Sequence, residues 1–270
     1  MLGLGSTLMG GAPPSEFTAA SISDLDLWYD FSTLTGSDGD DVSSFANAGD
    51  GGDDYDLTQS TADLKPHLET NDMALNSIKF DNSNDRLDLD NVYVTTGQTF
   101  TFFVVFETGQ AGSDVFLAGD DTTTHNFIRL AGANGVAIQT RFTGVTSGSA
   151  NNHVTTKTNG TESAGTNGDG NHTFRENTPE VLVMTRDASE ANKFYTYNAS
   201  SGDDLLICTS TSTTNNSSDT NYRVQTMGID GDGGDPYQGT IGEIGVYNKV
   251  LSADEIDSLV KHLASKWSIS

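Results

Sequence analysis

The chain has 270 residues, enough for one large all-β domain, and carries 38 acidic against 13 basic residues, a formal net charge of −25. This charge repels phosphate backbones and anionic lipid surfaces, which argues against nucleic acid as a partner. The apolar runs are too short to cross a membrane, so we expect no membrane insertion.

The acidic residues are unevenly chosen. Only nine of them are Glu, and the other 29 are Asp, beside 29 Gly. Asp and Gly favour turns, whereas Glu favours helices, so this composition is typical of a turn-rich β protein. The only cysteine, Cys208, lies in the apolar run "DLLICTS" and is predicted to be a buried thiol on a strand.

The N-terminal residues 1–20 are predicted to form an extended, Gly-rich arm outside the domain, which we place at residues 21–270. Residues 1–20 contain no Lys or Arg, since the first basic residue of the chain is Lys65, and glycines interrupt their apolar residues. Both features argue against a secretory signal. An arm of this kind cannot bury Leu2, Leu4 and Leu8 by itself. We therefore expect it to lie against other structural proteins, as part of an oligomeric assembly.

Short strand-like segments follow in chain order, with turn residues between them. "FTFFVVFE" at 100–107 is apolar on both faces, as in a central covered strand, and "FIRLAGANGVAIQTRF" at 127–142 is typical of a hairpin. About a dozen such strands predict a two-sheet antiparallel jelly-roll sandwich. The expected strands are Leu27–Phe31, Ser77–Phe80, Arg86–Leu89, Thr99–Glu107, Asp114–Ala118, Phe127–Leu130, Val136–Phe142, Glu180–Thr185, Phe194–Asn198, Leu205–Thr209, Tyr222–Gly228 and Gly242–Tyr247.

Two polar stretches, residues 32–63 and 143–171, are predicted to be long loops. The chain then ends in a predicted helix at 252–267. Ser252 and Glu255 have the spacing of a capping box, and apolar side chains recur on one face up to Trp267. This helix is expected to pack against the sandwich that precedes it.

The last strand and the helix share a pattern that consists of Gly239, Ile241, Glu243, Tyr247, Asn248, Leu251, Ser252, Glu255, Leu263, Lys266 and Trp267. This pattern resembles the C-terminal signature of concanavalin A-like jelly rolls of the laminin G-like type. Upstream, the strand "LDLWYD" and the strand pair "IKFDNSNDRLDL", with Asn82 where Gly is usual, occur in the order of that family. The resemblance runs from about Leu25 to Ser268 and implies the same fold with a docked final helix.

Candidate catalytic residues are lacking. A glycosidase needs two carboxylates at a fixed separation, and enzymes on this fold commonly place them on one strand as Glu-x-Asp-x-Glu, a string absent here. Glu243 stands alone on its strand and is interpreted as structural. No Gly-x-Ser-x-Gly nucleophile elbow occurs either. We therefore expect no enzymatic activity.

Two kinds of binding site are suggested by the loops. The turn "DGDGGDP" groups Asp230, Asp232 and Asp235, hard oxygen ligands that suit Ca²⁺, the one cofactor we consider. The five histidines show no zinc spacing. Carbohydrate recognition needs an aromatic ring beside polar loops, and the candidates for it are Tyr55, Tyr222 and Tyr237.

Three functional classes compete. The favoured one is a non-enzymatic structural protein of a bacteriophage virion, either a capsid decoration or a tail-fibre component, whose jelly roll binds host-surface carbohydrate. It depends on the resemblance, because laminin G-like modules are common in such particles. The alternative is a bacterial extracellular or cell-surface module for carbohydrate binding or adhesion. A glycosidase is the third, opposed by the missing carboxylate pair.

Overall fold

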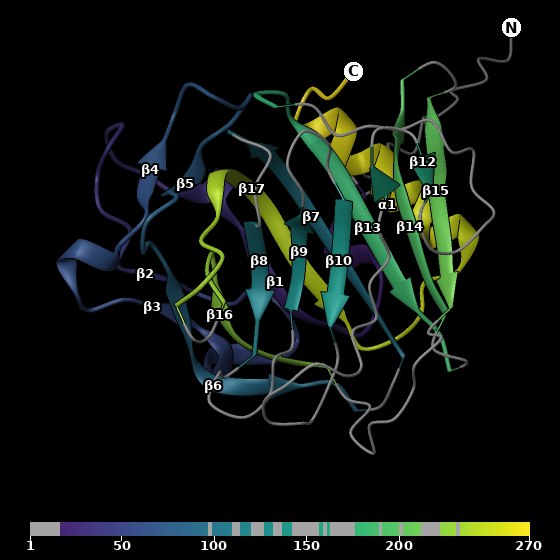
Figure 1. The fold of residues 1–270 in the computed structure, drawn as a ribbon, viewed down its shortest axis with the longest axis horizontal. Helices are drawn as coiled ribbons and strands as arrows, with labels where there is room; N and C mark the ends of the chain where they lie inside the picture. The colour runs from purple at the N-terminus through teal and green to yellow at the C-terminus, as the bar shows by residue number, and fades with distance from the viewer. Residues whose placement is uncertain are drawn as a thin grey trace, which may run out of the picture.

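The computed structural model is a sandwich of two antiparallel sheets (Figure 1). It describes residues 17–96, 99–109, 114–119, 127–131, 137–141, 157–158, 161–162, 176–188, 191–199, 202–211, 222–230 and 233–270. The expected fold class, an all-β jelly-roll sandwich with a short C-terminal helix, is confirmed. Short 3₁₀ helices occur at Ala19–Ser21, Phe31–Thr33, Gly52–Tyr55 and Ala62–Leu64.

The larger sheet has the strand order β15-β14-β13-β7-β17-β5-β4, and β1 pairs with β17 beside β5. Its strands are β1 (Leu25–Asp30), β4 (His67–Glu69), β5 (Ser77–Asp81), β7 (Phe100–Thr108), β13 (Glu180–Arg186), β14 (Ala191–Asn198), β15 (Asp203–Thr211) and β17 (Gln238–Tyr247).

The smaller sheet has the order β10-β9-β8-β16-β6-β3-β2. Its strands are β2 (Ser44–Phe45), β3 (Leu57–Thr58), β6 (Leu87–Val94), β8 (Asp114–Ala118), β9 (Phe127–Ala131), β10 (Ala137–Arg141) and β16 (Arg223–Met227). A separate pair consists of β11 (Lys157–Thr158) and β12 (Thr161–Glu162). The predicted hairpin is confirmed, since β9 pairs with β10.

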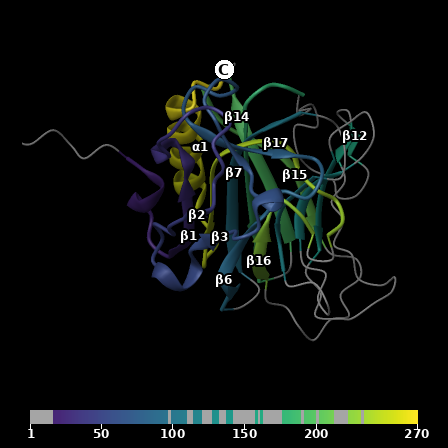
Figure 2. The ribbon, with the colours of Figure 1, turned by 90° about the vertical axis from the view of Figure 1, so that its left-hand side faces the viewer.

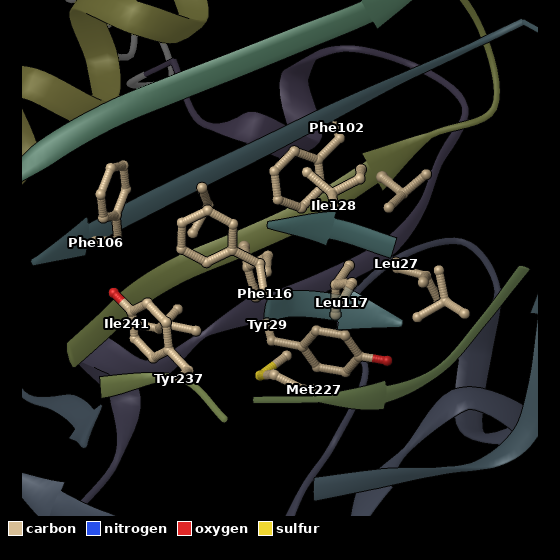
Figure 3. Close-up of a cluster of buried hydrophobic side chains, with 14 of the residues drawn as sticks. Leu27, Tyr29, Phe102, Phe106, Phe116, Leu117, Ile128, Met227, Tyr237 and Ile241 are labelled. Carbon is tan, nitrogen blue, oxygen red and sulfur yellow. The ribbon is translucent and has the colours of Figure 1, made fainter. Parts of the chain in front are cut away.

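The predicted central strand, β7, is buried along its whole length. Because side chains alternate across a strand, Phe102 and Phe106 point into the core between the sheets, whereas Phe103 points to the outer face. Figure 3 shows Phe102 and Phe106 beside Phe116 and Leu117 of the smaller sheet. Both faces of the larger sheet are therefore covered around β7.

The helix α1 (Ala253–Lys266) packs on the outer face of the larger sheet, against β13, β14 and β15 (Figure 2). The predicted capping box is present: the Ser252 hydroxyl accepts from the Glu255 amide at 3.3 Å, and the Glu255 carboxylate accepts from the Ser252 amide at 2.8 Å. Among the described helices none is long and apolar enough to cross a membrane.

The domain begins earlier in the chain than the sequence predicted. Ala19 is fully buried, and its carbonyl oxygen accepts a 2.9 Å hydrogen bond from the Tyr247 hydroxyl. Phe17 packs against the hydrophobic cluster on the outer face of the larger sheet, to which Ala19 and Tyr247 belong. The expected arm therefore cannot extend to residue 20, and its remaining part, residues 1–16, lies outside the described residues, as does the side chain of Cys208.

The turn between β5 and β6 holds a buried carboxylate. Asn82 has a φ of 64°, in the left-handed region that glycine and asparagine tolerate, which explains why it replaces the usual glycine. Asp85 is 4% exposed and accepts the amide of Asp81 at 3.0 Å. Burial raises the pKa of Asp85 to about 6, and the nearby Asp81 carboxylate adds to the shift.

Asp85 should therefore make the stability of the protein depend on pH. The folded state binds this proton more tightly than the unfolded state, so the contribution is present below pH 4 and is lost as the pH rises through about 6. Asp85→Asn cannot ionise and keeps an acceptor oxygen. Relative to the wild type, we expect this variant to gain about 2–3 kcal/mol of unfolding free energy between pH 4 and 7. Urea titrations at both pH values measure the difference, and a constant difference would contradict the shift.

Candidate functional site

The three tyrosines predicted to bind sugar lie in different environments. Tyr222 and Tyr237 are both fully buried, and that prediction is wrong for them. The Tyr222 ring stacks on Phe100 at 5.0 Å, and its hydroxyl donates to the Leu117 carbonyl. The Tyr237 hydroxyl donates to the Glu107 carbonyl at 3.0 Å. Each is a core residue near a polar loop, and neither can offer a ring face to a ligand.

Tyr55 is half-buried at the end of a 3₁₀ helix and packs edge-on against Tyr93 at 5.3 Å. Its carbonyl accepts the Tyr29 hydroxyl at 2.5 Å. Tyr55 thus covers the end of the core beside β6, and its role in sugar binding remains a prediction.

The predicted calcium ligands do not converge in the described part of the chain. Asp235 forms an ion pair with Arg129, and Asp230 is 8% exposed, with its amide bonded to the Gly234 carbonyl at 2.9 Å. Asp232 lies outside the described residues. Among the described residues, no three His, Cys, Asp or Glu side chains are placed to hold a metal ion. The calcium site stays a prediction without support from this geometry.

A groove between β1 and the last turns of α1 combines the features that the tyrosines lack. It has a volume of about 380 Å³. The half-buried Trp28 supplies an indole ring from β1, and polar side chains surround it. We call it the Trp28 groove, and it is lined by Thr18, Trp28, Asp30, His262, Ser265 and Lys266.

The two walls of the Trp28 groove are held by one buried carboxylate. Glu243 on β17 is fully buried. The Trp28 indole N–H donates to its Oε1 at 2.8 Å, and Lys266 Nζ donates to its Oε2 at 2.6 Å. The Trp267 indole N–H donates to the same Oε2 at 3.2 Å. Glu243 therefore fixes β1 and α1 relative to each other, as its predicted structural role requires.

Contacts within the protein also hold the polar side chains of the Trp28 groove in place. Lys266 Nζ lies 2.7 Å from Asp30 Oδ1, so an ammonium and a carboxylate stand next to the indole ring. On the opposite rim, the His262 ring meets Phe17 edge-on at 5.6 Å. Donors and acceptors fixed around a partly exposed aromatic ring can hold a ligand that has both hydroxyl groups and an apolar face.

Sequence reasoning missed this groove, although Trp28 stood in the family-like strand "LDLWYD". The sequence did contain one signal, because side chains alternate between the two faces of a strand. The residues on either side of Trp28 are buried, and Trp28 itself points to the other face and is half-buried. Its partners, however, lie at the other end of the chain. Only the docking of α1 beside β1 brings Lys266 and His262 to the ring.

Comparisons with known proteins agree with the fold. No protein-family model and no curated protein matches the sequence. Among solved structures, domain 4 of an extracellular GH43 arabinanase from Geobacillus stearothermophilus, in complex with arabinotriose, has a TM-score of 0.55 at 13% identity, over 88% of this chain and 98% of that one.

Two further structures have longer chains. A mutant GH54 α-L-arabinofuranosidase, soaked with a nitrophenyl arabinofuranoside, has a TM-score of 0.56 at 12% identity over 85% of this chain. The receptor-binding domain of botulinum neurotoxin type G has a TM-score of 0.52 at 10% identity over 90% of this chain. This chain spans 52% of each of those two. Together these likenesses establish that the chain has the two-sheet jelly-roll fold of these proteins.

Proposed function

We propose that the protein is a non-enzymatic, carbohydrate-binding jelly roll that holds its glycan in the Trp28 groove. The observation that carries this proposal is the half-buried indole ring beside the paired Asp30 carboxylate and Lys266 ammonium. The ring suits the apolar face of a sugar, and the charged pair suits its hydroxyl groups. The arabinotriose complex of a structural neighbour supports the same class of ligand on this fold.

The charge of the chain favours a neutral glycan. A net charge of −25 repels sugars that carry carboxylates or sulfates, and the repulsion acts on their approach as well as on the bound state. Within the groove, Lys266 is already neutralised by two carboxylates. We therefore expect neutral oligosaccharides to bind more tightly than sialylated or sulfated ones at low ionic strength.

The lining of the groove supports binding without hydrolysis. Asp30 is the only carboxylate among the lining residues, whereas a glycosidase needs two that flank the scissile bond. Glu243 does not line the groove, and its carboxylate is occupied by three donors. Incubation with a broad polysaccharide panel should release no reducing sugar. Turnover that Glu243→Gln abolishes would overturn this part of the proposal.

The setting we propose is a bacteriophage virion, as a capsid decoration or a tail component that presents the groove to the host surface. The support is the family resemblance of the sequence, and a bacterial extracellular or cell-surface adhesion module is the alternative. Immunogold labelling of native particles and of host cells distinguishes the two locations.

Trp28→Ala should weaken glycan binding at least about tenfold, because the ring supplies the apolar contact. The measurement is calorimetry with arabinotriose and with a panel of neutral oligosaccharides. Tyr55→Ala is the matched control: it removes another half-buried aromatic ring, one that packs on the core between the sheets and not on the outer cluster with Trp28, and it should leave the affinity unchanged. His262→Ala tests the groove rim without touching Glu243. If Tyr55→Ala abolishes binding while Trp28→Ala does not, the glycan site is at Tyr55.

A further inference from the structure

A second cleft, of about 280 Å³, lies on the outer face of the larger sheet, in the part that α1 does not cover. The strand register explains its composition. Thr240 of β17 lies opposite Glu107 of β7 on one side and Lys79 of β5 on the other. Lys79 in turn lies opposite His67 of β4. Since paired residues share a face, these side chains form one polar row across four strands.

The cleft is strongly acidic. Three carboxylates line it, those of Asp72, Asp81 and Glu107, against the single ammonium of Lys79. That ammonium is already held, since Lys79 Nζ donates to Asp72 Oδ2 at 2.6 Å and to Glu69 Oε2 at 3.1 Å. The hydrogen bond that Lys79 donates to Asp72 raises the pKa of Lys79. Lys79 thus stays charged and stays beside Asp72 and Glu69.

Glu107 differs from the other carboxylates of the cleft. It is only 9% exposed, yet its carboxylate has neither a hydrogen-bond partner nor an ion-pair partner among the described residues. Burial raises its pKa, and the nearby Asp72 adds to the shift. The Glu107 oxygens are not enclosed by protein, and Glu107 lines the cleft, so a ligand in the cleft can supply the donor that the described residues do not.

We propose that this cleft binds the protonated primary amine of a ligand, with Glu107 as its hydrogen-bond acceptor and counter-ion. An ammonium group carries both the donors and the positive charge that Glu107 lacks, since Lys79 is bonded to Asp72 and Glu69. A divalent metal fits less well, because it needs several oxygen ligands and the described residues hold no such group. The small volume suits an amino group on a sugar ring or on a short alkyl chain.

The site is independent of the Trp28 groove, and three probes separate the sources of the amine. Glucosamine trimer and N-acetylglucosamine trimer share a sugar chain but differ in charge, and butylamine carries the ammonium without a sugar. We expect the glucosamine trimer to bind, and to shift the amide NMR signals of Gly109 and Gly239, which line the cleft. In Trp28→Ala, whose groove no longer takes a neutral sugar, the acetylated trimer should bind at least tenfold more weakly than the glucosamine trimer. Binding of butylamine as tight as that of the trimer would assign the site to simple amines.

Glu107→Gln tests the acceptor while keeping the shape of the side chain. We expect the glucosamine trimer to bind this variant at least tenfold more weakly, and the variant to melt no lower than the wild type, because it buries no unpaired charge. Asp254→Asn is the matched control for net charge. Its site is exposed on the first turn of α1, at the end of β7 near Thr101, roughly 20 Å from Glu107. It should change the affinity less than twofold.

Three results would overturn the proposal: equal binding of both trimers to Trp28→Ala, unchanged binding of the glucosamine trimer by Glu107→Gln, or a lower melting temperature of Glu107→Gln, which would reveal a structural partner. Trp28→Ala separates this site from the groove. We expect it to lose neutral oligosaccharides and to keep the amine. Failure of amine binding alone would leave the proposed glycan site intact, and failure of glycan binding alone would leave the amine site intact.

Discussion

Glu243→Ala is expected to lower the free energy of unfolding by about 3–5 kcal/mol, because it removes the shared acceptor of a buried network. The substitution leaves the indole N–H groups of Trp28 and Trp267 without their acceptor, and it leaves Lys266 with Asp30 alone. Glu243 is fully buried, so water cannot replace it without a cavity. Urea denaturation at pH 7, followed by tryptophan fluorescence, measures the loss.

The matched control is Glu243→Gln, which keeps the shape and one acceptor oxygen but loses the charge that Lys266 faces. We expect a smaller loss, about 1–3 kcal/mol. If alanine costs less than 1 kcal/mol, Glu243 does not hold β1 and α1 together. The same two variants should also disturb the Trp28 groove, because Trp28 on one wall and Lys266 on the other both donate hydrogen bonds to Glu243.

Trp267→Ala is expected to destabilise the protein by a similar amount, about 3–5 kcal/mol, through a cavity under the end of α1. Trp267 is 1% exposed, and its ring fills the space above Gly242 on β17. A Cβ added at Gly242 would lie 2.7 Å from a ring atom. Glycine is therefore required there by the close approach of the indole. Thermal unfolding monitored by circular dichroism checks the loss.

A double-mutant cycle tests the contact itself. Gly242→Ala should be destabilising in the wild type, because the new methyl group overlaps the ring, and close to neutral in Trp267→Ala, where the ring is absent. Additive effects of the two substitutions would show that Trp267 does not pack on Gly242.

Several elements could be predicted from local sequence alone. The strand β7 is apolar on both faces, and that pattern already required cover on two sides. The helix α1 was predicted within one residue at each end, because its capping box and its apolar stripe are all encoded within a few turns. By contrast, the short strand β4 has three residues and no periodic signal, so it was missed, although it brings Glu69 to Lys79, which lines the Glu107 cleft.

Which side chains face a ligand was decided by the tertiary structure. Tyr222 and Tyr237 stand beside polar loops in the sequence, as a sugar-binding ring would, but each directly precedes a paired strand, β16 or β17, and both are buried in the core. Trp28 meets its acceptor 215 residues further along the chain. Alternation fixes which residues share a face of one strand, whereas contact between faces depends on strand register and on where the final helix docks. The sequence thus determined the sandwich fold and the helix α1 that covers its larger sheet. Only the packing of the two sheets and the helix determined where ligands can bind.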